Sequence, residues 1–164
     1  MSAAERMPAI FDMDIGSDPD DTCVATMILS DVARFVPVLL LTNDETPGFG
    51  RARFLSALVQ TARVDVPVAA GLPSQRPQRR CLVEDAGLCP PRGQFEDDGV
   101  TALSGVLEAH PRVRYFGLGA LTNLDAALSL RPDLCDRVRL FQMGPALQGA
   151  YHREWPQYNA RLDP

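Results

Sequence analysis

Apolar and polar positions follow two patterns along this chain, and each pattern predicts a different type of secondary structure. Apolar runs predict strands at residues 8–11, 35–42 and 66–70, and the continuous run at 35–42 is typical of a strand covered on both faces. Two further strands are predicted at 113–118 and 138–143, which are mostly apolar. Apolar side chains at helical spacing follow most of these runs, over residues 19–28, 51–62, 98–110 and 122–130. Residues 72–96, rich in proline, arginine, glutamine and glycine, predict a long irregular loop.

The alternation of strands and helices predicts a single α/β domain over residues 1–164, with a doubly wound, mostly parallel, Rossmann-like sheet flanked by helices. In such sheets, ligands bind beyond the carboxyl ends of the strands. Polar residues gather at those ends. Asn43 and Asp44 follow the second strand, and residues 118–123 and 144–159 follow the fourth and fifth. The pattern therefore predicts a binding site along this edge of the sheet.

The densest group of charges comes directly after the first strand and consists of Asp12, Asp14, Asp18, Asp20 and Asp21. Asp18 is expected to be the N-cap of the next helix and Pro19 its first residue. Two unit charges 4 Å apart repel by roughly 4 kcal/mol at an effective dielectric of 20, so the cluster requires a cation or protons. Oxygen ligands suit a hard ion, Ca²⁺ or Mg²⁺. The alternative is a solvated acidic turn.

Composition narrows the class of protein. A net charge of −5 without a basic stripe argues against nucleic acid as a partner. The chain has neither an 18-residue apolar run nor an apolar signal core near residue 1, so we expect a cytoplasmic protein without membrane contact. The cysteines lack metal-ligand spacing and are expected to be free thiols, with a Cys81–Cys89 bridge left open.

Several familiar sites do not fit the sequence. An EF-hand loop started at Asp12 would place ligand positions on Gly16 and Cys23, which cannot supply them in that motif. The chain also contains neither a P-loop nor a GxGxxG fingerprint, so the sequence gives no support to a nucleotide cofactor.

Three ordered motifs resemble the nucleoside hydrolase family, the calcium-dependent enzymes that cleave the N-glycosidic bond of ribonucleosides to base and ribose. Residues 12–21, DMDIGSDPDD, are similar to the family's Asp-x-Asp-Pro-Gly-x-Asp-Asp and to its branch with Asp-Ile-Gly-x-Asp-x-Asp-Asp. Residues 119–124, GALTNL, with Pro132 and Met143-Gly144 beyond them, resemble Gly-x-Leu-Thr-Asn … Pro … Met-Gly-Gly. Residues 158–164, YNARLDP, resemble Phe-Asn-x-x-x-Asp-Pro.

This resemblance implies a nucleoside-hydrolase-like fold and a small-molecule nucleoside substrate. The implied Ca²⁺ ligands are Asp14, Asp21 and the main-chain carbonyl of Leu118. Asp14 would also take the proton from a water held by the calcium. The implied ribose contacts are Asp20 and Asn159, helped by Asn43 or Asp44, between which the register stays open. Asn123 is expected to make hydrogen bonds within its loop or helix terminus rather than to contact substrate.

The chain also departs from the family's pattern. Pro145 replaces the second glycine after Met-Gly, and Gln157 replaces a glutamate. The family's further calcium-binding aspartate and its acidic histidine lie beyond Asp-Pro and map to no residue here. We therefore expect the N-terminal part of the fold, with exposed apolar surface that favours a homo-oligomer.

Two alternatives remain open. One is a catalytically impaired member of this family that binds a metal or a ribosyl ligand without turnover. The other is a haloacid-dehalogenase-type, Mg²⁺-dependent phosphatase, because residues 11–16 resemble its opening Asp-x-Asp motif. In that enzyme Asp12 would attack phosphorus and Asp14 would act as the acid. Gly16 in place of threonine or valine, and the lack of any lysine in the chain, count against it.

Overall fold

The computed structural model describes residues 6–73 and 81–143. These residues form a five-stranded sheet in the order β3-β2-β1-β4-β5, in which every pair of neighbouring strands is parallel. The strands are β1 (Ala9–Met13), β2 (Pro37–Thr42), β3 (Val68–Ala69), β4 (Val113–Gly117) and β5 (Val138–Gln142). The α-helices are α1 (Pro19–Ser30), α2 (Val32–Phe35), α3 (Gly50–Ala62), α4 (Leu82–Asp85), α5 (Gly99–Ala109) and α6 (Thr122–Leu130). A 3₁₀ helix spans Pro132–Arg137.

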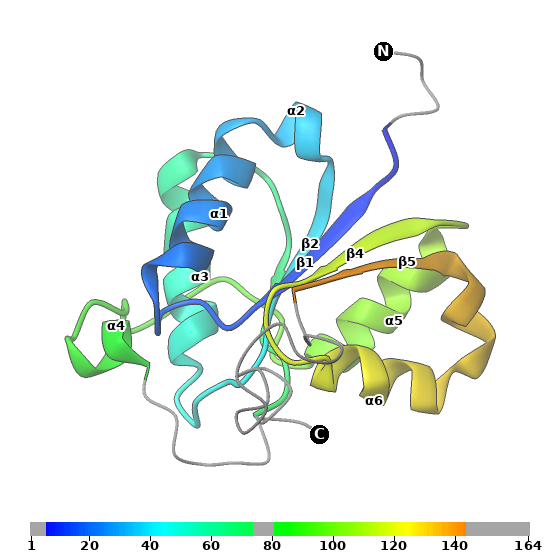
Figure 1. The fold of residues 1–164 in the computed structure, drawn as a ribbon. Helices are drawn as coiled ribbons and strands as arrows, with labels where there is room; N and C mark the ends of the chain where they lie inside the picture. Colours follow the sequence, from blue (N-terminus) through cyan, green and yellow to red (C-terminus); the bar gives the residue numbers. More distant parts are fainter. Residues whose placement is uncertain (1–5, 74–80, 144–164) are drawn as a thin grey trace, which may run out of the picture.

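The sheet is doubly wound, as the sequence predicts. From β1 the chain adds β2 and β3 on one side and later β4 and β5 on the other, so its direction of winding reverses at β1. Right-handed crossovers then put α1 and α3 on one face and α5 and α6 on the opposite face (Figure 1). In doubly wound sheets ligands bind at such a reversal, which here lies between the carboxyl ends of β1 and β4.

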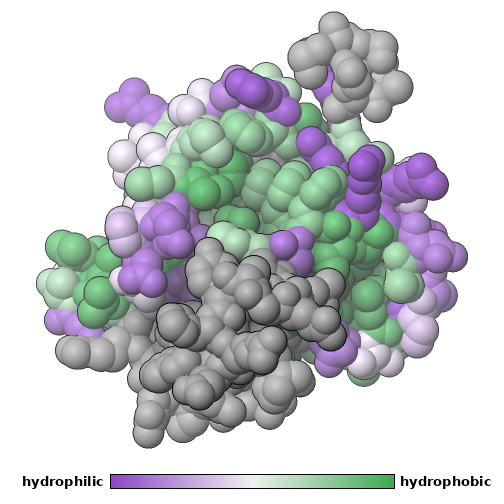
Figure 2. All heavy atoms as spheres, viewed as in Figure 1, coloured by the Kyte–Doolittle hydropathy of each residue, from purple (hydrophilic) through white to green (hydrophobic). Residues whose placement is uncertain are grey.

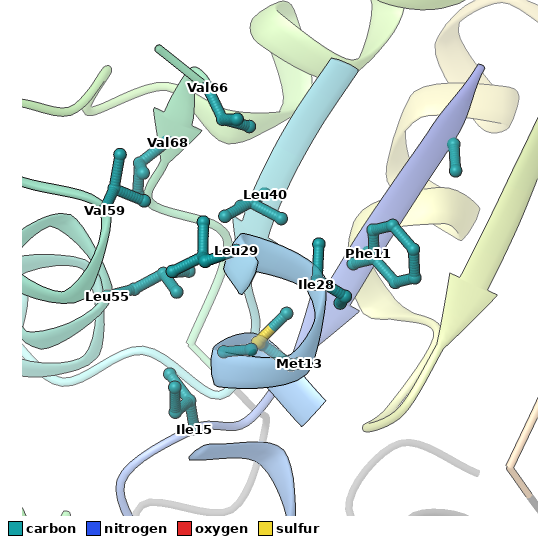
Figure 3. Packing of buried hydrophobic residues seen from close by; sticks show 12 residues of the cluster. Phe11, Met13, Ile15, Ile28, Leu29, Leu40, Leu55, Val59, Val66 and Val68 are labelled. Atoms are coloured by element: carbon teal, nitrogen blue, oxygen red, sulfur yellow. The ribbon is translucent and has the colours of Figure 1, made fainter. Parts of the chain in front are cut away.

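Strand β1 is buried along its whole length, which explains its apolar run. Phe11 and Met13 pack on the side of α1 and α3, where Figure 3 shows Met13 close to Ile28. Ile10 points the other way and packs with Tyr115 in the cluster beneath α5 and α6. The polar exception in this strand is Asp12, which therefore needs a special environment.

Several boundaries differ from the sequence-based expectation for local reasons. The strand expected from residue 35 begins at Pro37, because α2 takes in Phe35 and Val36 then adopts a left-handed φ of 53°. The strand expected over residues 66–70 has only the two residues that pair with β2. The predicted irregular loop contains α4 and a bridge from Glu96 to Ala69, and the 3₁₀ helix was not predicted.

Aspartates occupy the N-cap positions of α5 and α1, the second as the sequence predicts. Asp98 caps α5, since its carboxylate accepts the amide N–H of Thr101 at 3.0 Å. Asp18 occupies the N-cap position of α1 with Pro19 next, but its side chain makes no capping hydrogen bond. All four cysteines are free thiols, so the Cys81–Cys89 bridge is not formed.

The outer strand β5 leaves apolar surface open in the described part of the chain. Leu140 and Phe141 on β5 and the adjoining Met143 are exposed. Figure 2, drawn from the same side as Figure 1, shows hydrophobic surface gathered over the sheet. None of the helices within residues 6–73 and 81–143 has the length and apolar character needed to cross a membrane.

Two glycines give opposite predictions for stability. A Cβ added at Gly71 would run into the carbonyl oxygen of Thr42 and the side-chain amide of Asn123, whereas at Gly105, inside α5, it would meet no atom within 4 Å. Gly71→Ala should therefore lower the free energy of unfolding by about 1–3 kcal/mol, the usual cost of overpacking. Gly105→Ala should raise it by about 0.5–1 kcal/mol, because alanine has the better helix propensity.

Urea denaturation of both variants and the wild type at 25 °C measures these changes. A Gly71→Ala protein with the urea midpoint of the wild type would contradict the close packing of residue 71 against Thr42 and Asn123. Gly105→Ala serves as the matched control for adding one methyl group.

Candidate functional site

The carboxylate of Asp12 on β1 accepts hydrogen bonds from side chains on β4, on α6 and in the loop after β2. It is fully buried and accepts hydrogen bonds from the hydroxyl of Tyr115 on β4 and from Nδ2 of Asn43, at 2.9 Å, just after β2. Nδ2 of Asn123, in the first turn of α6, lies 3.1 Å from each Asp12 oxygen. Burial raises the pKa of Asp12 to about 6, and the hydrogen bonds from Tyr115, Asn43 and Asn123 oppose that rise.

This environment bears on two expectations. Both oxygens of Asp12 are engaged inside the protein, which weighs against Asp12 as the nucleophile of a phosphatase. Asn123 also donates to the carbonyl of Thr42 at 2.9 Å and accepts the amide N–H of Leu72 at 2.7 Å. It is thus the internal hydrogen-bonding residue that the sequence predicts.

Asp14 and Asp21 meet where β1 ends and α1 begins. Asp21 is buried in the first turn of α1, and its carboxyl group hydrogen-bonds with the side chain and the main chain of Asp14. Burial, followed by the charges of Asp14 and Asp20, raises the pKa of Asp21 to about 8. Oδ2 of Asp21 is buried and has no hydrogen-bond partner within residues 6–73 and 81–143. The pair therefore favours a shared proton or a cation over two free negative charges.

The donors at this corner fit a hard divalent cation. Asp14 and Asp21 offer carboxylate oxygens, one of them the unpartnered Oδ2. Leu118 directly follows β4, and its amide N–H donates to the carbonyl of Asp12 on β1 at 2.8 Å. Across residues 6–73 and 81–143 no three His, Cys, Asp or Glu side chains are grouped to hold a metal. An ion here would therefore also draw on main-chain, water or ligand oxygens, which Ca²⁺ accepts.

Asn43 presents an acceptor at the same edge. Its Nδ2 donates to Asp12, and its Oδ1 is buried with no hydrogen-bond partner in the part of the chain that the structure describes. Gly119, in the loop after β4, lies so close to this amide that a Cβ at that position would collide with it. The glycine at residue 119 therefore allows the loop after β4 to approach the loop after β2.

The remaining sequence-based candidates fall in different settings. Asp44 is buried, and its Oδ2 accepts from Nη2 of Arg51 at 3.0 Å, so its carboxylate forms an ion pair with the buried guanidinium. Asp20 is exposed in the first turn of α1 and accepts the amide N–H of Asp21 at 2.9 Å. Asn159 lies outside the described residues.

Sequence reasoning missed two residues that shape this edge. Glu45 is buried and holds the start of α3, because it accepts the amide N–H groups of Arg51 and Ala52, each at 3.0 Å. Arg51 is fully buried, although the sequence shows it only as the first residue of an amphipathic pattern. The one available signal was that a cluster of carboxylates requires positive charge nearby.

The fold is similar to that of several solved structures. A plant nucleoside hydrolase, PpNRh1, matches with a TM-score of 0.67 at 22% identity over 86% of this chain and 48% of its own. The inosine-uridine preferring nucleoside hydrolase from Bacillus anthracis matches with a TM-score of 0.67 at 15% identity over 96% of this chain and 59% of its own. The type III effector XopQ, solved with adenosine diphosphate ribose, matches with a TM-score of 0.69 at 23% identity over 88% of this chain and 47% of its own.

These likenesses establish the architecture of the chain as the nucleoside-hydrolase-like α/β fold. The chain spans about half the length of the structures that it matches. No family model and no curated protein matches the sequence.

The buried carboxyls predict how stability depends on pH when no divalent cation is present. The pKa of Asp21 is about 8 in the folded protein against a usual 3.8, so the folded state binds more protons than the unfolded state between these values. The free energy of unfolding should therefore fall as pH rises from about 4 to about 8. Asp12, with a folded pKa of about 6, contributes to this fall only below about pH 7.

Asp21→Asn should flatten the dependence of the free energy of unfolding on pH above pH 6, because the variant lacks the carboxyl group that releases a proton on unfolding at these pH values. Urea denaturation at a series of pH values in the presence of a chelator gives the slope. Asp18→Asn, at an exposed position in the same loop, is the matched control and should keep the wild-type slope. A wild-type profile that is flat from pH 6 to 8 would contradict the protonated pair.

Proposed function

We propose that this chain binds Ca²⁺ and a ribosyl group at the carboxyl edge of its sheet and takes part in hydrolysing the N-glycosidic bond of ribonucleosides. The observation that carries the proposal is the contact between the half-buried Asp14 and the buried Asp21, at the carboxyl end of β1 beside β4. The fold shared with nucleoside hydrolases adds support, since two of the similar structures bear that name.

The proposed calcium ligands are Asp14, Asp21 and the carbonyl of Leu118. Calcium, when bound, supplies positive charge that lowers the pKa of an adjacent water and orients ribose hydroxyls. Asp14 then serves as the base that accepts the proton of the attacking water. Its negative charge also stabilises the oxocarbenium-like sugar that forms as the bond to the base breaks.

Ribose recognition follows from the polar groups around the pair. Between the two candidates that follow β2, we assign the contact to Asn43, whose Oδ1 has no hydrogen-bond partner among the described residues. Asp44 instead neutralises Arg51. Asp20, exposed beside Asp21, and Asn159 complete the proposed set of ribose contacts.

A second candidate function is binding of a ribosyl ligand without turnover. His110 is the histidine that the described ranges contain, and it ends α5 just before β4 begins. It therefore lies at the opposite end of the sheet from the carboxylates, where it cannot protonate a leaving base. The similar effector structure holds adenosine diphosphate ribose, which makes this compound the natural probe for binding.

Release of ribose from a panel of purine and pyrimidine nucleosides tests the hydrolase proposal. The wild type with Ca²⁺ should release ribose, and Asp14→Ala should lower the rate by about 10²–10⁴-fold, the usual contribution of a general base. A chelator should abolish the activity. Asp18→Ala removes a carboxylate from the same loop at an exposed position and should retain the wild-type rate.

Two further arms separate the alternatives. Calcium-dependent binding of adenosine diphosphate ribose without ribose release from any nucleoside would favour the binding module. Phosphate release from p-nitrophenyl phosphate with Mg²⁺ would contradict both proposals in favour of the phosphatase.

A further inference from the structure

Arg51 is completely buried in the first turn of α3, and each of its five N–H groups has an acceptor. Nε donates to the carbonyl of Asp44 at 2.8 Å, and Nη2 donates to Oδ2 of the same residue at 3.0 Å. Nη1 donates to the carbonyls of Asp14 and Ile15, the latter at 2.7 Å, and Nη2 also donates to Oγ of Ser17 at 3.0 Å. A buried guanidinium with every donor satisfied is fixed in one position.

These acceptors belong to two loops that are far apart in the sequence. Asp14, Ile15 and Ser17 lie in the acidic loop between β1 and α1, whereas Asp44 lies in the loop after β2. The acidic loop turns at Gly16, whose φ of +99° favours glycine. The planar fork of Arg51 therefore sets the path of the acidic loop against a second, independently anchored loop.

Arg51 itself is anchored from the other side. Its amide N–H donates to Oε1 of Glu45 at 3.0 Å, and Glu45 also accepts the hydroxyl of Thr42 at 2.7 Å. The guanidinium thus extends from a helix start that is tied to the end of β2. The position of the guanidinium is therefore set by its connection to the sheet through Glu45 and Thr42.

The contacts also decide which oxygens of the loop remain for a cation. The main-chain carbonyls of Asp14 and Ile15 already accept from Arg51, so they are directed toward α3. The carboxyl group of Asp14 meets Asp21 instead. In this geometry the loop offers carboxylates to an ion and withholds two of its carbonyls.

We propose that Arg51 is a positioning residue, which holds the acidic loop in the shape that lets Asp14 and Asp21 face one divalent cation. The inference rests on the proposed function, because it assumes that this pair binds Ca²⁺. Arg51 does not touch the cation or the substrate. It acts through the main chain of residues 14–17.

Calcium affinity measured by calorimetry on the folded 164-residue chain tests the inference. Arg51→Lys keeps a positive charge but has three donors that cannot span both loops, and Arg51→Met removes the charge. Both variants should bind Ca²⁺ at least about tenfold more weakly, which corresponds to about 1.4 kcal/mol. Ser17→Ala removes one acceptor without leaving a full buried charge unpaired, and it should weaken binding by about threefold.

Leu103→Ala is the control for stability alone. Leu103 is a buried residue of α5 in the other hydrophobic cluster, so its truncation lowers the melting temperature without touching the acidic loop. It should bind Ca²⁺ like the wild type. An equal loss of affinity in Leu103→Ala would overturn the inference, because any destabilisation would then have the same effect.

The other outcomes are equally decisive. Wild-type affinity in Arg51→Lys overturns the role of Arg51 and leaves the proposed function in place. If both Arg51 variants fail to fold, an unchanged affinity in Ser17→Ala overturns it instead. A wild type that binds no Ca²⁺ overturns the proposed function together with this inference.

Discussion

A buried carboxyl group in hydrogen-bond contact with a second carboxyl group disfavours two negative charges without a compensating ion, and this constraint governs the site. Asp14 and Asp21 are in this position, and a pKa near 8 for Asp21 shows how strongly the folded chain resists the second charge. One consequence is that the metal-free protein should hold an extra proton. The other is that a divalent cation, which removes the repulsion, should bind here in place of that proton.

The rest of the fold places this pair and keeps it in place. The winding of the sheet reverses at β1, and the parallel pairing brings the carboxyl ends of β1, β2 and β4 to one edge. Asp12 fastens those ends from inside through Tyr115, Asn43 and Asn123, so a buried polar network occupies the layer beneath the proposed ion. Arg51 fastens the acidic loop from the side of α3. Neither residue needs to touch a ligand to determine where ligands bind.

The alternation of strands and helices in a parallel, doubly wound sheet and the acidic loop after the first strand are periodic or local features, so the sequence predicted them. Contacts between distant loops are not periodic, which is why the sequence did not predict the role of Arg51. Its side chain joins residues 14–17 to Asp44, and no spacing rule connects these segments. The sequence also left the choice between Asn43 and Asp44 open, because that choice depends on which of the two side chains pairs with the buried Arg51. Short elements such as α2 and α4 were missed because they have only four residues each.

A crystal of the chain grown with Tb³⁺ in place of Ca²⁺ tests the central claim most directly, since anomalous scattering locates a lanthanide without assumptions about the protein. The account predicts one anomalous peak between the carboxylates of Asp14 and Asp21, near the carbonyl of Leu118, and its loss in Asp21→Asn crystals. Ordered side chains at Asp14 and Asp21 with no peak between them would contradict the account.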